Sequence, residues 1–150
     1  MPTTFDLFGR AERIEIVSAA IYGALAKRFR EDAEAQELFV RLEAEELQHA
    51  TRVRLLASAY RTDPKVLGKV SGGDELADCL SAAEEALHEV QSGGFGSSLD
   101  DVKQRLALLE VRLANAHANM LVRNGSGGLR DFFEQLARMD DAHARLLLDA

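Results

Sequence analysis

Apolar residues return at every third or fourth position along most of the chain, which is the period of one face of an α-helix. Ile14, Val17, Ile21 and Leu25 show this spacing in the first stretch. The same pattern predicts helices over about residues 4–30, 31–60, 74–91, 98–123 and 129–148. Four of these helices are long and the one at 74–91 is shorter, so the predicted fold class is all-α.

Segments that stop helices separate these stretches, and they lie at Asp63-Pro64, 71–73, 92–98 and 124–128. Ser98 is typical of a helix start, because its hydroxyl can cap the first turn and Asp100 and Asp101 favour the positive end of the helix dipole. The segment of about 62–97, with its short helix, is then a long crossover inside one domain of residues 1–150.

The second and last long helices match each other at a constant offset of 94 positions, as Phe39-x-x-Leu42-x-x-x-Glu46-x-x-His49-Ala50 and Phe133-x-x-Leu136-x-x-x-Asp140-x-x-His143-Ala144. The first and third long helices match at an offset of 95, as Ile14-Glu15-Ile16 and Leu109-Glu110-Val111. The pattern indicates a duplicated helix hairpin. Four long helices with one long crossover form a known bundle topology.

Composition narrows the class of function. The chain has 150 residues, 47% of them apolar, which is enough for the core of one domain. Its formal charge of −7 argues against nucleic acid as a partner. No apolar run reaches the roughly 20 residues that span a bilayer, and the N-terminus does not resemble a signal peptide, so no membrane association is expected. The single Cys79 cannot form an internal disulfide, and a reducing cytoplasm is the expected location.

Six acidic and histidine residues stand at matched places in the two halves: Glu15, Glu46, His49, Glu110, Asp140 and His143. Residues three apart on a helix share a face, so each carboxylate-x-x-His pair can bind one ion, and the two remaining glutamates can reach or bridge both ions. Carboxylates and imidazoles without thiolates favour iron or manganese over a structural zinc site. The alternative is that these groups are solvated charges on outer faces, but the two remaining glutamates stand among apolar neighbours. The sequence therefore predicts a dinuclear metal site.

This arrangement resembles the rubrerythrin-type members of the ferritin-like di-iron carboxylate proteins. The resemblance covers nearly all of the four long helices, is weakest over about 62–97, and rests on Glu15, Glu46-x-x-His49, Glu110, His143 and Tyr22, which lies two turns after the first glutamate. It implies a ferritin-like four-helix bundle of two pseudo-repeated hairpins that binds two iron ions, with manganese also possible. It further implies that the protein reduces peroxide or dioxygen or oxidises ferrous iron, takes electrons from an external donor and forms a homodimer.

Three features depart from that family. Asp140 stands where the family usually has glutamate, and its shorter side chain is expected to weaken the second metal position. Leu113 occupies the place of an additional glutamate one turn after Glu110, so no ligand switch between oxidation states is expected. The single Cys79 leaves no four-cysteine rubredoxin-like module, so any electrons are expected to come from a separate donor.

Tyr22 and His117 are further candidates at the site. His117 lies two turns after Glu110. Three functional roles are open to it: an additional metal ligand, a hydrogen-bond donor to a ligand, or a proton relay. The structural alternative is a polar side chain that is hydrogen-bonded inside the bundle. Tyr22 either donates a hydrogen bond to oxygen at the metals or is an amphipathic core residue. Glu45 flanks the ligands, and we expect it to point to another face and to be solvated.

These residues favour a non-haem di-iron oxidoreductase. One alternative is an iron-binding protein for storage or delivery that does not turn over a separate substrate. Another is a helical interaction protein whose metal site has degraded. The metal content of the purified protein separates the last class from the first two.

Overall fold

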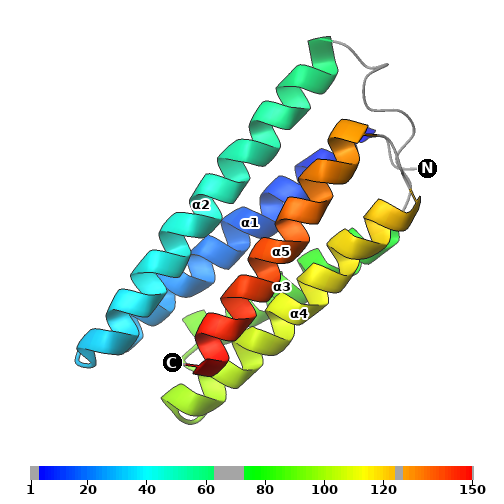
Figure 1. Cartoon of the computed structure of the whole chain (residues 1–150). Coiled ribbons are helices and arrows are strands. Elements are labelled where there is room, and N and C mark those ends of the chain that lie inside the picture. The colour runs from blue at the N-terminus through cyan, green and yellow to red at the C-terminus, as the bar shows by residue number, and fades with distance from the viewer. Residues whose placement is uncertain (1–3, 63–72, 124–126, 150) are drawn as a thin grey trace.

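The computed structural model describes residues 4–62, 73–123 and 127–149, which form five helices (Figure 1). They are α1 (Thr4–Arg28), α2 (Ala33–Thr62), α3 (Gly73–Gln91), α4 (Leu99–Arg123) and α5 (Gly127–Asp149). The all-α class and the predicted helices are confirmed, with ends that differ by one or two residues. The predicted breaks at Asp63-Pro64, 71–72 and 124–126 lie outside the described residues.

Side-chain caps and one glycine set the ends of several helices. The carboxylate of Asp32 accepts a hydrogen bond from the Ala35 amide at 3.1 Å, so α2 begins after the short turn that follows α1. Ser98 caps α4 as predicted, because its hydroxyl accepts a hydrogen bond from the Asp101 amide at 3.2 Å. After α3, Gly93 has a φ of 86°, a left-handed conformation that glycine adopts without steric cost.

The long helices form two antiparallel pairs, α1 with α2 and α4 with α5 (Figure 1). Helix α3 contacts α1 and α4 and runs back along the bundle, so that α2 and α4 point in the same direction. The chain therefore crosses from one pair to the other by traversing the length of the bundle.

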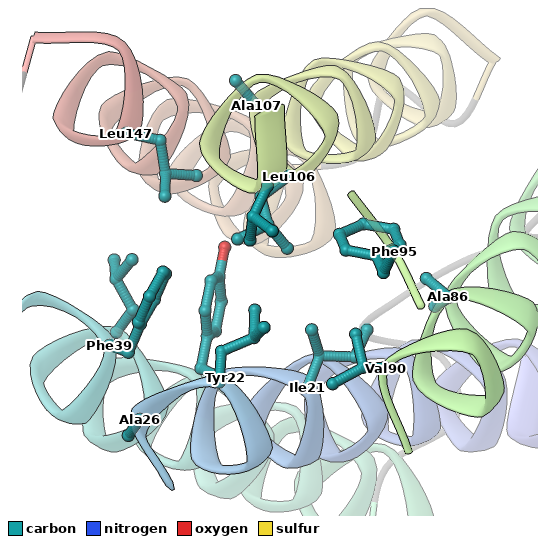
Figure 2. Close-up of a cluster of buried hydrophobic side chains, with 14 of the residues drawn as sticks. Ile21, Tyr22, Ala26, Phe39, Ala86, Val90, Phe95, Leu106, Ala107 and Leu147 are labelled. Atoms are coloured by element: carbon teal, nitrogen blue, oxygen red, sulfur yellow. The ribbon is translucent and has the colours of Figure 1, made fainter. Parts of the chain in front are cut away.

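Two apolar clusters fill the bundle, one towards each end. The first contains Tyr22, Phe39 and Leu106 and is drawn in Figure 2, and the second contains Ile14, Leu113 and further apolar side chains of α1–α5. Each of the four long helices has residues in both clusters. On each helix the predicted ligands lie between the residues of the first cluster and those of the second. Within the described ranges, no helix combines the length and apolar character that a membrane crossing requires.

Candidate metal centre

The first half of the site comes from α1 and α2. Glu15, Glu46 and His49 are buried, and one ligand atom from each lies within 4.8 Å of the others, a grouping that can hold a metal ion. The His49 Nδ1 atom lies 3.5 Å from Glu15 Oε2 and 3.7 Å from Glu46 Oε2. The i, i+3 spacing on α2 puts the glutamate and the histidine on the face that meets α1, as the sequence predicts.

The second half adds α4 and α5. Glu110 and His143 form a second group with Glu46, again with ligand atoms within 4.8 Å of one another. The Nδ1 atom of His143 lies 2.7 Å from Glu46 Oε1 and 3.5 Å from Glu110 Oε1. Glu46 thus belongs to both groups and could offer one oxygen to each.

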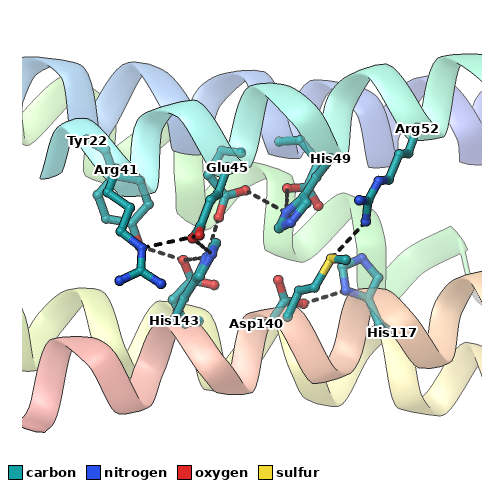
Figure 3. A network of polar contacts seen from close by, with 12 residues as sticks. Tyr22, Arg41, Glu45, His49, Arg52, His117, Asp140 and His143 are labelled. Carbon is teal, nitrogen blue, oxygen red and sulfur yellow. Dashed lines mark hydrogen bonds and ion pairs between the residues drawn. The ribbon is translucent and has the colours of Figure 1, made fainter. Parts of the chain in front are cut away.

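Asp140 lies outside both groups. It is buried, and its Oδ2 atom lies 2.6 Å from Nδ1 of His117, whose side chain is fully buried (Figure 3). An aspartate is one methylene shorter than glutamate, so its carboxyl group ends nearer its own helix, within reach of the imidazole on α4. Of the roles considered for His117, the structure places it as the hydrogen-bond partner of Asp140.

The buried hydroxyl of Tyr22 is satisfied by a hydrogen bond to a predicted ligand. Its hydroxyl donates to Glu110 Oε1 at 2.5 Å, while its ring lies in the apolar cluster beside Phe39. Burial, with the nearby Glu110 carboxylate, raises the pKa of this phenol well above its usual value, so it stays a donor. The hydrogen bond fixes the orientation of a predicted metal ligand.

Burial among like charges dominates the electrostatics of the acids. It raises the pKa of Glu15 to about 8, with a further contribution from the Glu46 carboxylate. Burial opposes the ionised form of Glu46 too, but the Glu15 carboxyl group and the two imidazoles around it outweigh burial and lower its pKa. Burial, with Glu110 and Glu15, raises the pKa of Asp140 well above its usual range. Glu15 and Asp140 therefore retain protons in the absence of cations.

The three imidazoles respond to their neighbours in different ways. Burial disfavours the charged form of His49, but Glu15 and Glu46 outweigh it and raise its pKa to about 9. Glu110 and Glu46 likewise overcome burial at His143 and raise its pKa to about 11. At His117 burial prevails and lowers the pKa. The first two imidazoles thus take up protons where a metal ion would otherwise supply positive charge.

Each of the six predicted ligands has at least one buried oxygen or nitrogen without a hydrogen-bond partner among the described residues: Glu15, Glu46, His49, Glu110, Asp140 and His143. An unsatisfied buried polar group costs about 1–3 kcal/mol. A structural role does not explain why so many unpaired atoms occur together. Cations held by the two ligand groups would satisfy those of Glu15, Glu46, His49, Glu110 and His143. The donor set fits hard or borderline metal ions, because it has carboxylate oxygens and imidazole nitrogens only.

Glu45 corrects one sequence-based expectation. It is half-buried, and its Oε2 atom lies 2.9 Å from Nε2 of His143, on the side of the ring that faces away from the carboxylates. Its other oxygen accepts a hydrogen bond from Arg41 at 3.3 Å. The expectation that Glu45 is merely solvated was wrong, because the long side chain reaches across to α5. Ser18, buried one turn after Glu15 with an unpaired hydroxyl, was also missed.

A pocket of about 280 Å³ opens between α2 and α5 above the two imidazoles. His49 and His143 lie in its lining, together with Glu45, Arg52 and Met139. A larger hollow of about 900 Å³ elsewhere on the surface contains none of the predicted ligands. The smaller pocket therefore lies directly against the two candidate imidazole ligands.

The sequence matches no model of a protein family and no curated protein, and the fold matches no solved structure. The interpretation of the site therefore rests on its residues and their geometry.

Proposed function

We propose that this protein binds two transition-metal ions in its core and acts as a non-haem di-iron oxidoreductase of rubrerythrin type. One observation carries the proposal, namely the two groups of buried carboxylates and imidazoles, drawn from four helices and sharing Glu46, whose ligand atoms lie within 4.8 Å of one another in each group. Glu15, Glu46 and His49 would hold one ion, and Glu46, Glu110 and His143 the other. The role of these residues as ligands stays a prediction, as does that of Asp140.

The proposal extends to a ferritin-like bundle of two pseudo-repeated hairpins. The 94- and 95-residue offsets support it, because they match residues on the first helix pair to residues on the second. The long return through α3 supports it too, since such a crossover lets two hairpins lie side by side with α2 and α4 in the same direction.

Iron is the proposed metal, with manganese as the alternative, because the donors are oxygens and imidazoles. The single thiol takes no part, since the Cys79 sulfur contacts the backbone carbonyl of Arg112 at 3.9 Å and burial raises its pKa. Bound iron would supply one-electron redox chemistry and open coordination positions for peroxide or dioxygen.

The residues of the chain prepare this site in three ways. The apolar clusters on either side exclude water, which strengthens the electrostatic interactions of the ligands. Tyr22 holds the carboxylate of Glu110 in place, and His117 holds that of Asp140. Glu45 accepts a hydrogen bond from the outer nitrogen of His143, which orients the inner nitrogen towards Glu46.

Anaerobic loading with ferrous iron, followed by rapid mixing with peroxide or with dioxygen, tests the redox function. We expect the loaded protein to oxidise its iron faster than free ferrous iron in the same buffer, and an added reductant to sustain peroxide consumption. Iron oxidation without sustained turnover would favour storage or delivery. Rates equal to those of free iron would contradict both functions. The homodimer, the external electron donor and the cytoplasmic location stay predictions.

Asp140→Glu is expected to raise the metal occupancy when metal is limiting. The added methylene lets the carboxylate extend past His117 towards the ions, and a metal–oxygen bond of roughly 2.0–2.2 Å requires that reach. Metal per chain after dialysis against a weak chelator measures the effect. Asp141→Glu, at an exposed position on the same helix, is the control. An unchanged occupancy in Asp140→Glu would count against residue 140 as a ligand.

A further inference from the structure

The outer nitrogens of the two candidate imidazole ligands have different neighbours. The rings of His49 and His143 stack with centroids 5.4 Å apart, and each turns Nδ1 towards the buried carboxylates. Nε2 of His143 is 2.9 Å from the Glu45 carboxylate (Figure 3). Within residues 4–62, 73–123 and 127–149, no carboxylate pairs with Nε2 of His49. Of the two adjacent imidazoles, that of His143 thus has a carboxylate at its outer nitrogen, whereas that of His49 has none in the described part of the chain.

The internal repeat shows where the inequality originates. The offset of 94 positions that matches Glu46 to Asp140 and His49 to His143 also matches Glu45 to Met139. A thioether is a weak hydrogen-bond acceptor, so Met139 cannot do for one imidazole what Glu45 does for the other. Instead its sulfur contacts the Arg52 guanidinium at 3.8 Å.

A carboxylate behind a metal-bound imidazole fixes the orientation of the ring and makes it a stronger ligand, and its removal typically costs 10- to 100-fold in metal affinity. The position of His143 has this support, while the position of His49 has a thioether and a cation nearby. The pocket between α2 and α5 is lined by both imidazoles, with Arg41 and Glu45 near His143 and Arg52 near His49 (Figure 3).

The charge at the pocket indicates which ligands it admits. Arg41 is paired with Glu45 at 3.3 Å, whereas Arg52 has no carboxylate partner in the described part of the chain. The lining thus holds two guanidinium groups against one carboxylate, on a chain with a net charge of −7. A guanidinium without a carboxylate partner at the opening attracts small anions.

We infer that the two metal positions are inequivalent: Glu45 anchors the ion beside His143, whereas the ion beside His49 is exchangeable and takes a small anionic ligand that enters past Arg52. The inference rests on the proposed metal binding and goes beyond it by assigning a different role to each position. Glu45 acts as a positioning residue, through His143.

Titration of the metal-free protein with Co²⁺, followed by visible absorption, tests the inequivalence. Wild type should bind two ions with affinities about 10- to 100-fold apart. Glu45→Gln should weaken the tighter site and bring the two affinities together. Met139→Glu, which places a carboxylate behind His49, should strengthen the weaker site. Met139→Leu and the exposed Glu37→Gln are controls that should leave both affinities unchanged.

Two equal affinities in wild type, or no response to either Glu45→Gln or Met139→Glu, would overturn the inference while leaving the proposed metal binding intact. A protein that binds no metal would overturn both. Melting curves of the metal-free variants show whether each one folds, so that a lost site is not confused with a lost fold.

Azide, a small monoanion that binds Co²⁺, tests the route. Arg52→Gln should weaken azide binding to the cobalt-loaded protein roughly fivefold, the effect of one nearby charge in water. Arg54→Gln is the matched control, because Arg54 pairs with Glu12 at 2.8 Å and is not part of the pocket lining. Equal azide affinity in wild type and Arg52→Gln would overturn the assignment of an anion route.

Discussion

Glu46→Gln is expected to abolish the binding of both metal ions at once. Glu46 is the only residue common to the two candidate ligand groups found in the described part of the chain, so its loss removes a ligand from each position. Loss of an outer-shell partner alone costs 10- to 100-fold in affinity, so loss of a shared ligand should cost more than about 100-fold at both sites. Metal per chain after reconstitution, measured by elemental analysis, checks this.

Two comparisons make the Glu46 result specific. Glu37→Gln, an exposed change on the same helix, should keep full metal content. The metal-free form of Glu46→Gln is expected to melt at a lower temperature than wild type, because the change removes a carboxylate partner from the buried imidazoles of His49 and His143. A melting curve of this metal-free variant therefore shows whether a lost site reflects a lost fold. A Glu46→Gln protein that retains two ions per chain would show that this carboxylate is not shared between them.

The stability of the metal-free protein is expected to fall as the pH rises from 6.5 to 8.5. The pKa of Glu15 rises from 4.5 to about 8 on folding, and those of His49 and His143 rise from 6.5 to about 9 and about 11. A raised pKa means that the folded state holds a proton that the unfolded state has released, so its contribution to stability is full at low pH and is lost as the pH rises. These three windows overlap between pH 6.5 and 8.

If the folded state holds only one proton more than the unfolded state, the free energy of unfolding falls by about 1.4 kcal/mol for each pH unit of increase. Over two units this corresponds to a drop of roughly 5–10 °C in melting temperature for a domain of this size. His117 does not oppose the trend, because burial lowers its pKa and its contribution is already complete above pH 6.5. Calorimetry of chelator-treated protein provides the measurement.

Metal binding should show the opposite pH dependence, because the ligands must lose protons before they bind a metal ion. The apparent metal affinity should therefore rise over the same pH range.

Glu15→Gln should flatten the dependence of the metal-free melting temperature on pH, whereas the exposed Glu37→Gln should not. A metal-free melting temperature that is constant or increases from pH 6.5 to 8.5 would contradict the uptake of protons by Glu15, His49 and His143 on folding.

Hydrophobic period and internal repetition predict much of this molecule. The spacing of Ile14, Val17 and Ile21 places α1 and its buried face, and the same reasoning holds for the other helices. The six candidate ligands are buried, as expected, because each lies on the apolar face of a long helix. The hydrophobic period identifies the inward face of a helix. That face was sufficient to predict that Glu15, Glu46 and Glu110 lie near one another inside the bundle.

The contacts between helices that are distant in sequence could not be predicted in the same way. The pairing of Asp140 with His117, and that of Glu45 with His143, depend on the relative height and rotation of two helices, which no single-helix pattern specifies. A difference of one methylene decides which partner residue 140 reaches. One signal was present in the sequence: the repeat matches Glu45 to Met139, a break in symmetry beside the ligands.

Anomalous diffraction from crystals of the anaerobically iron-loaded protein tests the central claim most directly. The account predicts two iron peaks inside the bundle on either side of Glu46, one beside His49 and one beside His143. Fully loaded crystals with no iron peak in the core, or with iron only on the surface, would contradict it.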